Sequence, residues 1–174
     1  MTVALRPFDA DTDSARLAEL MNTVRRHPIT EEELRERERT QPESRIRFRV
    51  TAVSTAAHGE RVVGYGETGR DPWMAAGSFW FDLIVDPAAR RQGIGTMLYD
   101  DLLQFAWELG ATRLIARIGE HTPEGLRFVL AHDFQLGPLG ASLDLAATFG
   151  APAGERDDGP CSPPLVPELT GNRP

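Results

Sequence analysis

The residues best suited to chemistry lie in one stretch, from Val85 to Thr96, which reads Val-Asp-Pro-Ala-Ala-Arg-Arg-Gln-Gly-Ile-Gly-Thr. Its pattern predicts the end of a strand, a short loop and the start of a helix. Gly93 and Gly95 have no side chains, so the backbone could come close to a ligand there. The first amides of a helix have no partner within it, and the helix dipole adds positive charge. Such a turn binds phosphate oxygens, and Arg90 and Arg91 would add positive charge for a diphosphate.

The composition narrows the classes of protein to which this stretch could belong. The 174 residues include 19 basic and 26 acidic ones, which gives a formal net charge of -7 at pH 7, and every basic residue is arginine. The absence of lysine excludes a lysine Schiff base, a pyridoxal-phosphate anchor and the lysine of nucleotide-binding loops. The acidic balance argues against a nucleic-acid partner, because duplex binding relies on cationic contacts with phosphates. It slightly favours a cationic small molecule.

Neither a metal site nor a membrane segment is expected. The four histidines lack the spacing of zinc ligands, and the only cysteine, Cys161, cannot form an internal disulfide. No apolar run approaches the roughly 20 residues that span a bilayer, and Met1 to Arg6 lacks the layout of a secretion signal. We therefore expect a cytoplasmic protein without a membrane partner.

Two helices are predicted near the amino terminus, after a short strand from Thr2 to Phe8. The segment from Asp11 to Asp13 offers N-cap oxygens to the first helix, whose apolar residues recur at helical spacing. Thr30 and Glu33 form a capping box at the start of the second helix, which we expect to end near Thr40.

Alternation with a period of two begins at Arg45 and predicts a half-buried strand. Apolar residues lie on one face of this strand, and Arg45, Arg47 and Arg49 lie on the other. We expect the arginines to form a solvated outer face rather than an anion site.

Two further strands follow, and each has a distinct pattern. The first, Arg61 to Glu67, would pair with the preceding strand as a hairpin, and Gly64 and Gly66 should weaken it locally. The loop from Thr68 to Gly77 carries large apolar side chains, which suit either a binding-site wall or a packed loop. The second strand, Ser78 to Val85, is almost continuously apolar, which is typical of a strand covered on both faces.

The remaining elements complete one domain over residues 1–148. Gly, Pro, Ser and charged residues dominate 149–174, so we expect a flexible Pro/Gly-rich tail there. The closing strands could pair across a homodimer. The elements predicted after the glycine loop are a helix from about Gly93 that ends at Gly110, a strand at Arg113–Ile118, a helix from Thr122 or Pro123 to Ala131, and closing strands at Phe134–Leu136 and Ser142–Thr148.

The glycine loop and this order of elements resemble the GNAT superfamily of N-acetyltransferases. The family signature is Arg or Gln, two residues, Gly, one residue, then Gly or Ala, after a strand ending in Val-x-Pro. Arg90, Gly93 and Gly95 match it, and the resemblance extends over roughly Thr2 to Thr148. It implies an α/β fold with a mixed, mostly antiparallel sheet flanked by helices, in which strands four and five splay apart to form a cofactor cleft.

The resemblance also implies acetyl-CoA, or a related acyl-CoA, as co-substrate. An acetyl group would pass to a primary amine of a small molecule or a peptide by direct attack in a ternary complex. The pantetheine arm would run along strand four and bond to main-chain atoms. The implied cofactor-binding residues are Leu83, Ile84 and Val85 on the strand, then Arg90, Arg91, Gln92, Gly93, Ile94, Gly95 and Thr96 around the diphosphate.

The chain departs from the family pattern at the general acid. Many members carry a tyrosine in the helix after the fifth strand, within Asn-x-x-Ala-x-x-Phe-Tyr-x-x-x-Gly-Phe. This chain has Val129 in place of the tyrosine and Thr122 in place of the asparagine. Valine cannot donate a proton, so either the thiolate leaves unassisted or the domain binds the cofactor without turning it over. The alternative function is therefore a non-catalytic acyl-CoA-binding module.

Carboxylates near the expected cleft are candidates for the general base. Asp82 and Glu120 are the catalytic candidates, and Glu67 and His121 are two further possible bases. Each has a structural alternative, which is a hydrogen bond within the sheet for Asp82 and a solvated position for Glu120. Nothing in the sequence specifies the acceptor amine.

Overall fold

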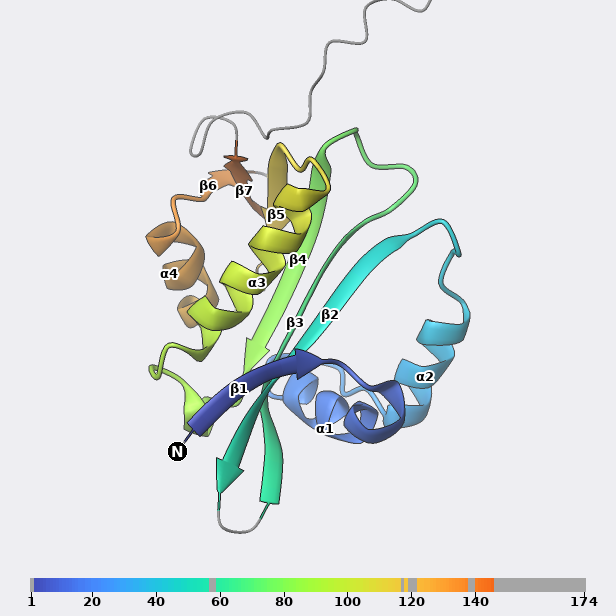
Figure 1. Cartoon of the computed structure of the whole chain (residues 1–174), viewed down its shortest axis with the longest axis vertical. Helices are drawn as coiled ribbons and strands as arrows, with labels where there is room; N and C mark the ends of the chain where they lie inside the picture. The colour runs from blue at the N-terminus through green and yellow to red at the C-terminus, as the bar shows by residue number, and fades with distance from the viewer. Residues whose placement is uncertain (1, 57–58, 117, 119–121, 138–139, 146–174) are drawn as a thin grey trace, which may run out of the picture.

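The computed structural model describes residues 2–56, 59–116, 118, 122–137 and 140–145 (Figure 1). Residues 149–174, predicted to form a tail, and the end of the last predicted strand lie outside this part of the chain. Among the described residues, no helix is long and apolar enough to cross a membrane. The elements in chain order are β1 (Thr2–Pro7), α1 (Ala10–Asn22), α2 (Glu31–Arg39), β2 (Ile46–Ala56), β3 (Gly59–Arg70), β4 (Ser78–Val85), the 3-10 turn η1 (Pro87–Ala89), α3 (Ile94–Glu108), β5 (Arg113–Ala116), α4 (Pro123–Ala131), β6 (Gln135–Gly137) and β7 (Gly140–Asp144).

The described strands form one sheet in the order β1-β2-β3-β4-β5-β7-β6. Only β4 and β5 are parallel, and the other neighbouring strands are antiparallel. The predicted mixed, mostly antiparallel sheet is confirmed, as are the bounds of β4. The strand β3 is longer than the predicted Arg61–Glu67, since it runs from Gly59 to Arg70.

The helix α3 packs closely on one face of the sheet because β3 carries glycines there. A Cβ atom at Gly64 would lie 3.1 Å from Ile94 Cγ2 and from Leu98 Cδ1, and one at Gly66 would lie 3.1 Å from Leu102 Cδ1. These leucines and Ile94 are at most 1% exposed. The glycines therefore make room for the core, and the expectation that they only weaken the strand missed this role.

The opposite face of the sheet is covered by α1 and α2. Tyr65 on β3 is buried there with Leu17 and Ala18 of α1 and Leu34 of α2. The capping box of Thr30 on α2 is confirmed.

The predicted cap of α1 is wrong, because the N-cap is Asp9. The Asp9 side chain accepts from the Asp11 amide at 2.9 Å. Asp13 instead accepts from Arg6 Nη1 and Nη2, both at 2.7 Å, so its carboxylate joins α1 to β1. A carboxylate paired with a guanidinium is held more strongly than a cap alone, which explains why Asp13 has this role.

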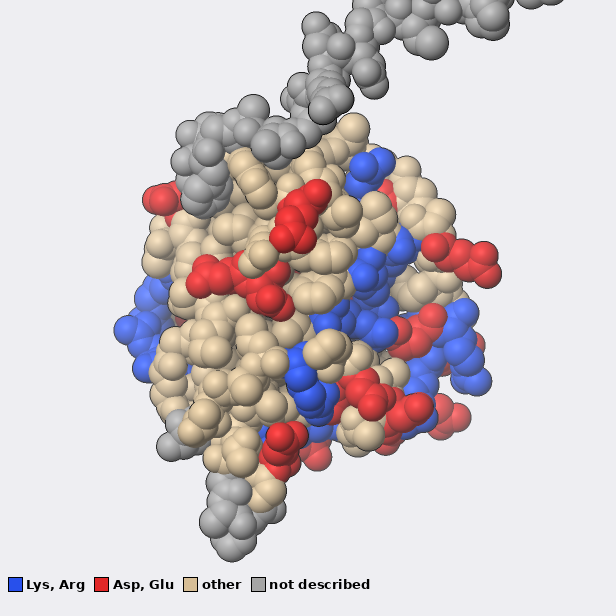
Figure 2. All heavy atoms as spheres, viewed as in Figure 1, with Lys and Arg blue, Asp and Glu red and all other residues tan. Residues whose placement is uncertain are grey.

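The predicted solvated face of arginines on β2 is also wrong. The side chains of Arg45, Arg47 and Arg49 are between 18% and 24% exposed, and all three form ion pairs with acidic residues. The physical reason is that this face of β2 turns toward α2, whose Glu38 contacts both Arg47 and Arg49. Figure 2 shows the basic side chains gathered over β2 between α3 and α2, with acidic side chains next to them.

Asp86, directly after β4, holds the following loop in place. Its carboxylate accepts from the Ala88 amide at 2.9 Å and from Arg61 Nη2 at 3.1 Å, and it pairs with Arg16 of α1. Arg16 Nε also donates to the Val62 carbonyl at 3.1 Å. Burial acts to raise the pKa of the Asp86 carboxyl, but the Ala88 amide and the two guanidinium groups outweigh it and lower the pKa below 3.8.

We predict that Asp86→Asn lowers the free energy of unfolding at pH 7 by about 2 kcal/mol, because it removes charge-assisted bonds from a residue that is 8% exposed. The folded-state pKa is lowered, so this contribution is present above pH 3.8 and is lost as the pH falls through the folded value. Urea unfolding at pH 7 and pH 3 should therefore show a smaller difference from wild type at pH 3. The exposed Asp100→Asn is the control and should change stability by less than about 0.5 kcal/mol. An equal difference at both pH values would contradict this account.

Candidate functional site

The described pairing of β4 with β5 is shorter than its pairing with β3. The parallel pairing runs only from Ser78 with Arg113 to Phe81 with Ala116, whereas β3 pairs with β4 as far as Val85. From Asp82 onward, no described strand pairs with the β5 side of β4. Arg117 and residues 119–121 lie outside the described residues, so the splaying of these two strands stays a prediction.

The register of β3 and β4 determines which main-chain groups point to this open edge. The Asp86 amide donates to the Val63 carbonyl at 2.8 Å, and in an antiparallel pair alternate residues bond to the partner strand. The main-chain groups of Asp82 and Ile84 therefore point to β3, and those of Leu83 and Val85 point to the open edge. Of the predicted main-chain contacts on β4, Leu83 and Val85 lie at the edge and Ile84 does not.

Arg90 ties the glycine loop to the end of this edge. Its Nε donates to the Val85 carbonyl at 3.2 Å, so a side chain satisfies a group that a strand would otherwise bond. The loop and the start of α3 are thereby held at the carboxyl end of β4 (Figure 1). Arg91 and Gln92 are exposed beyond it.

The loop leaves the amino terminus of α3 open. Gly93 is the N-cap, with φ at +80°, and makes no side-chain cap; Arg91 also has a positive φ, of +62°. The first intrahelical bond runs from the Met97 amide to the Gly93 carbonyl at 3.0 Å. The amides of Ile94, Gly95 and Thr96 precede it and therefore have no acceptor within the helix.

The two glycines of the loop have different roles. A Cβ atom at Gly93 would meet nothing within 4 Å, but one at Gly95 would lie 3.2 Å from Phe128 Cε2 on α4. The missing side chain at Gly95 therefore makes room for α4. Sequence reasoning, which assigned both glycines to a ligand, missed this contact because Phe128 is 33 positions away in the chain.

The position of the family tyrosine is occupied by a core residue. Val129 is 4% exposed and belongs to the main hydrophobic cluster of the sheet and α3. Four residues later, Asp133 takes a φ of +62° where the family pattern has glycine, a conformation that aspartate tolerates better than most residues. The backbone of this segment thus adopts the left-handed turn without the glycine.

Of the two catalytic candidates, only Asp82 can be placed. Asp82 lies opposite Glu67 across β3 and β4 and is half-buried. Glu120 and His121 lie outside the described residues. Glu67 accepts from Arg47 Nε and Nη2 at 2.9 and 2.6 Å and from the Tyr65 hydroxyl at 2.7 Å. This cluster was not predicted, although the hairpin register of β2 and β3 could have pointed to it.

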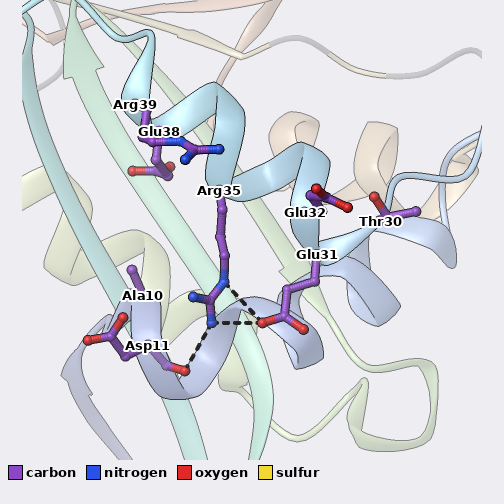
Figure 3. A pocket seen from close by; sticks show the side chains of 8 residues that line it. All are labelled: Ala10, Asp11, Thr30, Glu31, Glu32, Arg35, Glu38 and Arg39. Atoms are coloured by element: carbon purple, nitrogen blue, oxygen red, sulfur yellow. Dashed lines mark hydrogen bonds and ion pairs between the residues drawn. The ribbon is translucent and has the colours of Figure 1, made fainter.

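A separate surface hollow of about 600 Å³ lies between α1 and α2, on the opposite side of the sheet from α3 (Figure 3). Arg35 crosses it from α2 and donates to the Asp11 carbonyl at 3.4 Å and to Glu31 Oε1 at 2.8 Å. Glu38 connects the hollow to the cluster on β2, because its carboxylate also accepts from Arg47. The residues that line it are Ala10, Asp11, Thr30, Glu31, Glu32, Arg35, Glu38 and Arg39.

A seven-stranded sheet divided at a parallel β4–β5 pair and flanked by four helices is the GNAT fold. The model of the acetyltransferase (GNAT) family matches residues 15–134, which is more than half of the chain. The chain therefore belongs to the acetyltransferase (GNAT) family.

Solved structures share this fold at low sequence identity. An N-acetyltransferase from Staphylococcus aureus Mu50 is 19% identical, with a TM-score of 0.65, over 83% of this chain and 99% of that one. A phosphinothricin acetyltransferase from Sinorhizobium meliloti, in complex with acetyl-CoA, is 22% identical, with a TM-score of 0.63, over 88% and 95%. The acetyltransferase yncA from Salmonella typhimurium, with acetyl-CoA, is 17% identical, with a TM-score of 0.62, over 83% and 95%. No protein of curated function matched the chain.

We predict that Gly95→Val lowers the free energy of unfolding by about 2 kcal/mol, because the new side chain overlaps Phe128. Phe128→Leu in the same chain should recover at least half of this loss, because the two side chains share one space. Urea unfolding of the wild type, both single variants and the double variant measures the coupling. Strictly additive losses would show that Gly95 is not constrained by α4.

Proposed function

We propose that the chain is an N-acetyltransferase that moves an acetyl group from acetyl-CoA to a primary amine of a small molecule or a peptide. The observation that carries the proposal is the edge of β4 beyond Phe81, which pairs with no described strand and leads to the open amino terminus of α3. Family membership and the acetyl-CoA bound to two similar structures support it.

The residues at this edge suit the co-substrate chemically. The amides from Arg91 to Thr96 would receive the diphosphate oxygens, as expected of a helix amino terminus. Gly93 leaves open space above the loop, and the exposed Arg91 adds positive charge in a chain of net charge -7. The main-chain groups of Leu83 and the amide of Val85 would bond the amides of the pantetheine arm, much as an added strand would.

The reaction proposed for this cleft is direct transfer. The amine nitrogen attacks the thioester carbonyl carbon, the carbon–sulfur bond breaks, and the nitrogen gives up a proton to a base. The Leu83 amide could stabilise the oxyanion, and Asp82 is the candidate base among the described residues. With Val129 at the tyrosine position, the thiolate would leave unassisted and take its proton from water.

A second candidate function is a non-catalytic acyl-CoA-binding module. The burial of Val129, at the position where many family members carry their general acid, favours it. This module would bind acetyl-CoA but release no thiol in the presence of amines. The same assay therefore separates the two candidates.

We predict that Gly93→Ala weakens acetyl-CoA binding about tenfold in isothermal titration calorimetry, because a side chain at a φ of +80° distorts the loop beneath the diphosphate. Gly110→Ala is a matched control at the other end of α3. Gly110 has a φ of +76° and also has nothing within 4 Å of its Cβ position, so both variants should lose about 1 kcal/mol of stability.

Only the loop variant should lose affinity for acetyl-CoA. Equal affinities for the two variants would place the diphosphate elsewhere. Thiol release from acetyl-CoA over a panel of primary amines then tests transfer, and binding without release on any amine would favour the module.

A further inference from the structure

Glu67 lies beside the point where the described pairing of β4 with β5 ends. It is the register partner of Asp82, and Asp82 is the first residue of β4 beyond the last pair with β5. Directly opposite residues of an antiparallel pair point to the same face, and this is the face that carries Tyr65 and is covered by α1 and α2. A carboxylate is thus placed beside the end of the cleft where the proposed thioester would lie.

The described hydrogen bonds of Glu67 all go to one of its two oxygens. Oε2 accepts from Arg47 Nε, Arg47 Nη2 and the Tyr65 hydroxyl, at 2.6 to 2.9 Å. No described residue donates to Oε1. Burial, followed by the Glu67 carboxylate, raises the pKa of the Tyr65 hydroxyl well above 10.0, so this hydroxyl stays a donor. The side chain of Glu67 is 15% exposed, so a charge that reaches Oε1 is only weakly screened by water.

The arginines around this carboxylate are already neutralised. Arg47 Nη1 donates to both oxygens of Glu38, at 2.8 and 2.9 Å, and Arg49 pairs with the same carboxylate at 3.0 Å. Directly before β2, Arg45 pairs with Asp71. Three arginines therefore face three carboxylates, which are Glu38, Glu67 and Asp71. Each of these arginines already lies against a carboxylate, although Arg49 Nη1 is buried and makes no hydrogen bond to a described residue.

We propose that Glu67 Oε1 receives the ammonium group of the acceptor, and that the acceptor is a primary amine without a carboxylate on the carbon that bears the nitrogen. Arg47 and Tyr65 are positioning residues, because they hold Oε2 and so direct Oε1. A carboxylate next to the acceptor nitrogen would lie close to Glu67, where every described arginine of the cluster already has a carboxylate partner, and its desolvation would not be offset. This inference rests on the proposed function, because it concerns the acceptor of the same transfer.

Matched acceptor pairs test the substrate class without any mutation. The pairs are histamine with histidine, tyramine with tyrosine, and agmatine with arginine, which differ only in the carboxylate. We expect thiol release from acetyl-CoA to show a kcat/KM at least tenfold higher for the amine than for the amino acid in at least one pair. In no pair should the amino acid be preferred. If no compound is acetylated, calorimetric titration of the same pairs into the protein saturated with coenzyme A measures their binding directly.

Variants test the residues. Glu67→Gln should raise the KM for the preferred amine at least tenfold and leave the Kd for acetyl-CoA unchanged. Tyr65→Phe should raise the KM for the same amine about threefold and leave the KM for acetyl-CoA unchanged. A general loss of structure would change both KM values. Glu36→Gln is the control. Glu36 is exposed on α2, and among the described residues its ion pair is with Arg39.

The outcomes separate this inference from the proposed function. Failure of acetyl-CoA to bind the wild-type chain would overturn the proposed function. If acetyl-CoA binds, then preference for an amino acid over its decarboxylated amine, or failure of every amine to bind, would overturn the inference. An unchanged acceptor KM in Glu67→Gln would also overturn it. If that variant does not fold, Tyr65→Phe and the acceptor pairs decide.

Discussion

The interruption of main-chain hydrogen bonding along β4 is the constraint on which the rest of the structure depends. Over the described residues, this strand pairs with β3 as far as Val85 but with β5 only as far as Phe81. Main-chain groups in the middle of a sheet need partners, and the chain supplies one of them from the Arg90 side chain. The groups of Leu83 keep no described partner, so a ligand with amides of its own would complete the sheet.

The two faces of the sheet serve different parts of the proposed reaction. On the α3 face, Gly64 and Gly66 let the helix lie close, so its open amino terminus is held by the core. On the α1 and α2 face, alternating arginines and carboxylates tie α2 to the sheet through Glu38. The carrier would be held mainly by main-chain groups and the acceptor mainly by charged side chains.

The sequence pattern predicted those features that depend only on residues close together in the chain. The continuous apolar run of β4, the capping box at Thr30 and the glycine loop before α3 were all predicted and are where expected. The arginines of β2 were misinterpreted because alternation specifies a face but not what covers it, and α2 covers this one. The role of Gly95 and the cluster at Glu67 depend on contacts between distant segments, which no single stretch of sequence contains.

Amide hydrogen exchange, followed by NMR with coenzyme A and separately with pantetheine, tests the central claim most directly. The account predicts that coenzyme A slows exchange at Leu83 and at Ile94, Gly95 and Thr96. Pantetheine, which lacks the diphosphate, should slow exchange at Leu83 but not at the three amides of α3. Unchanged exchange at all four amides in the presence of saturating coenzyme A, or protection confined to α1 and α2, would contradict it.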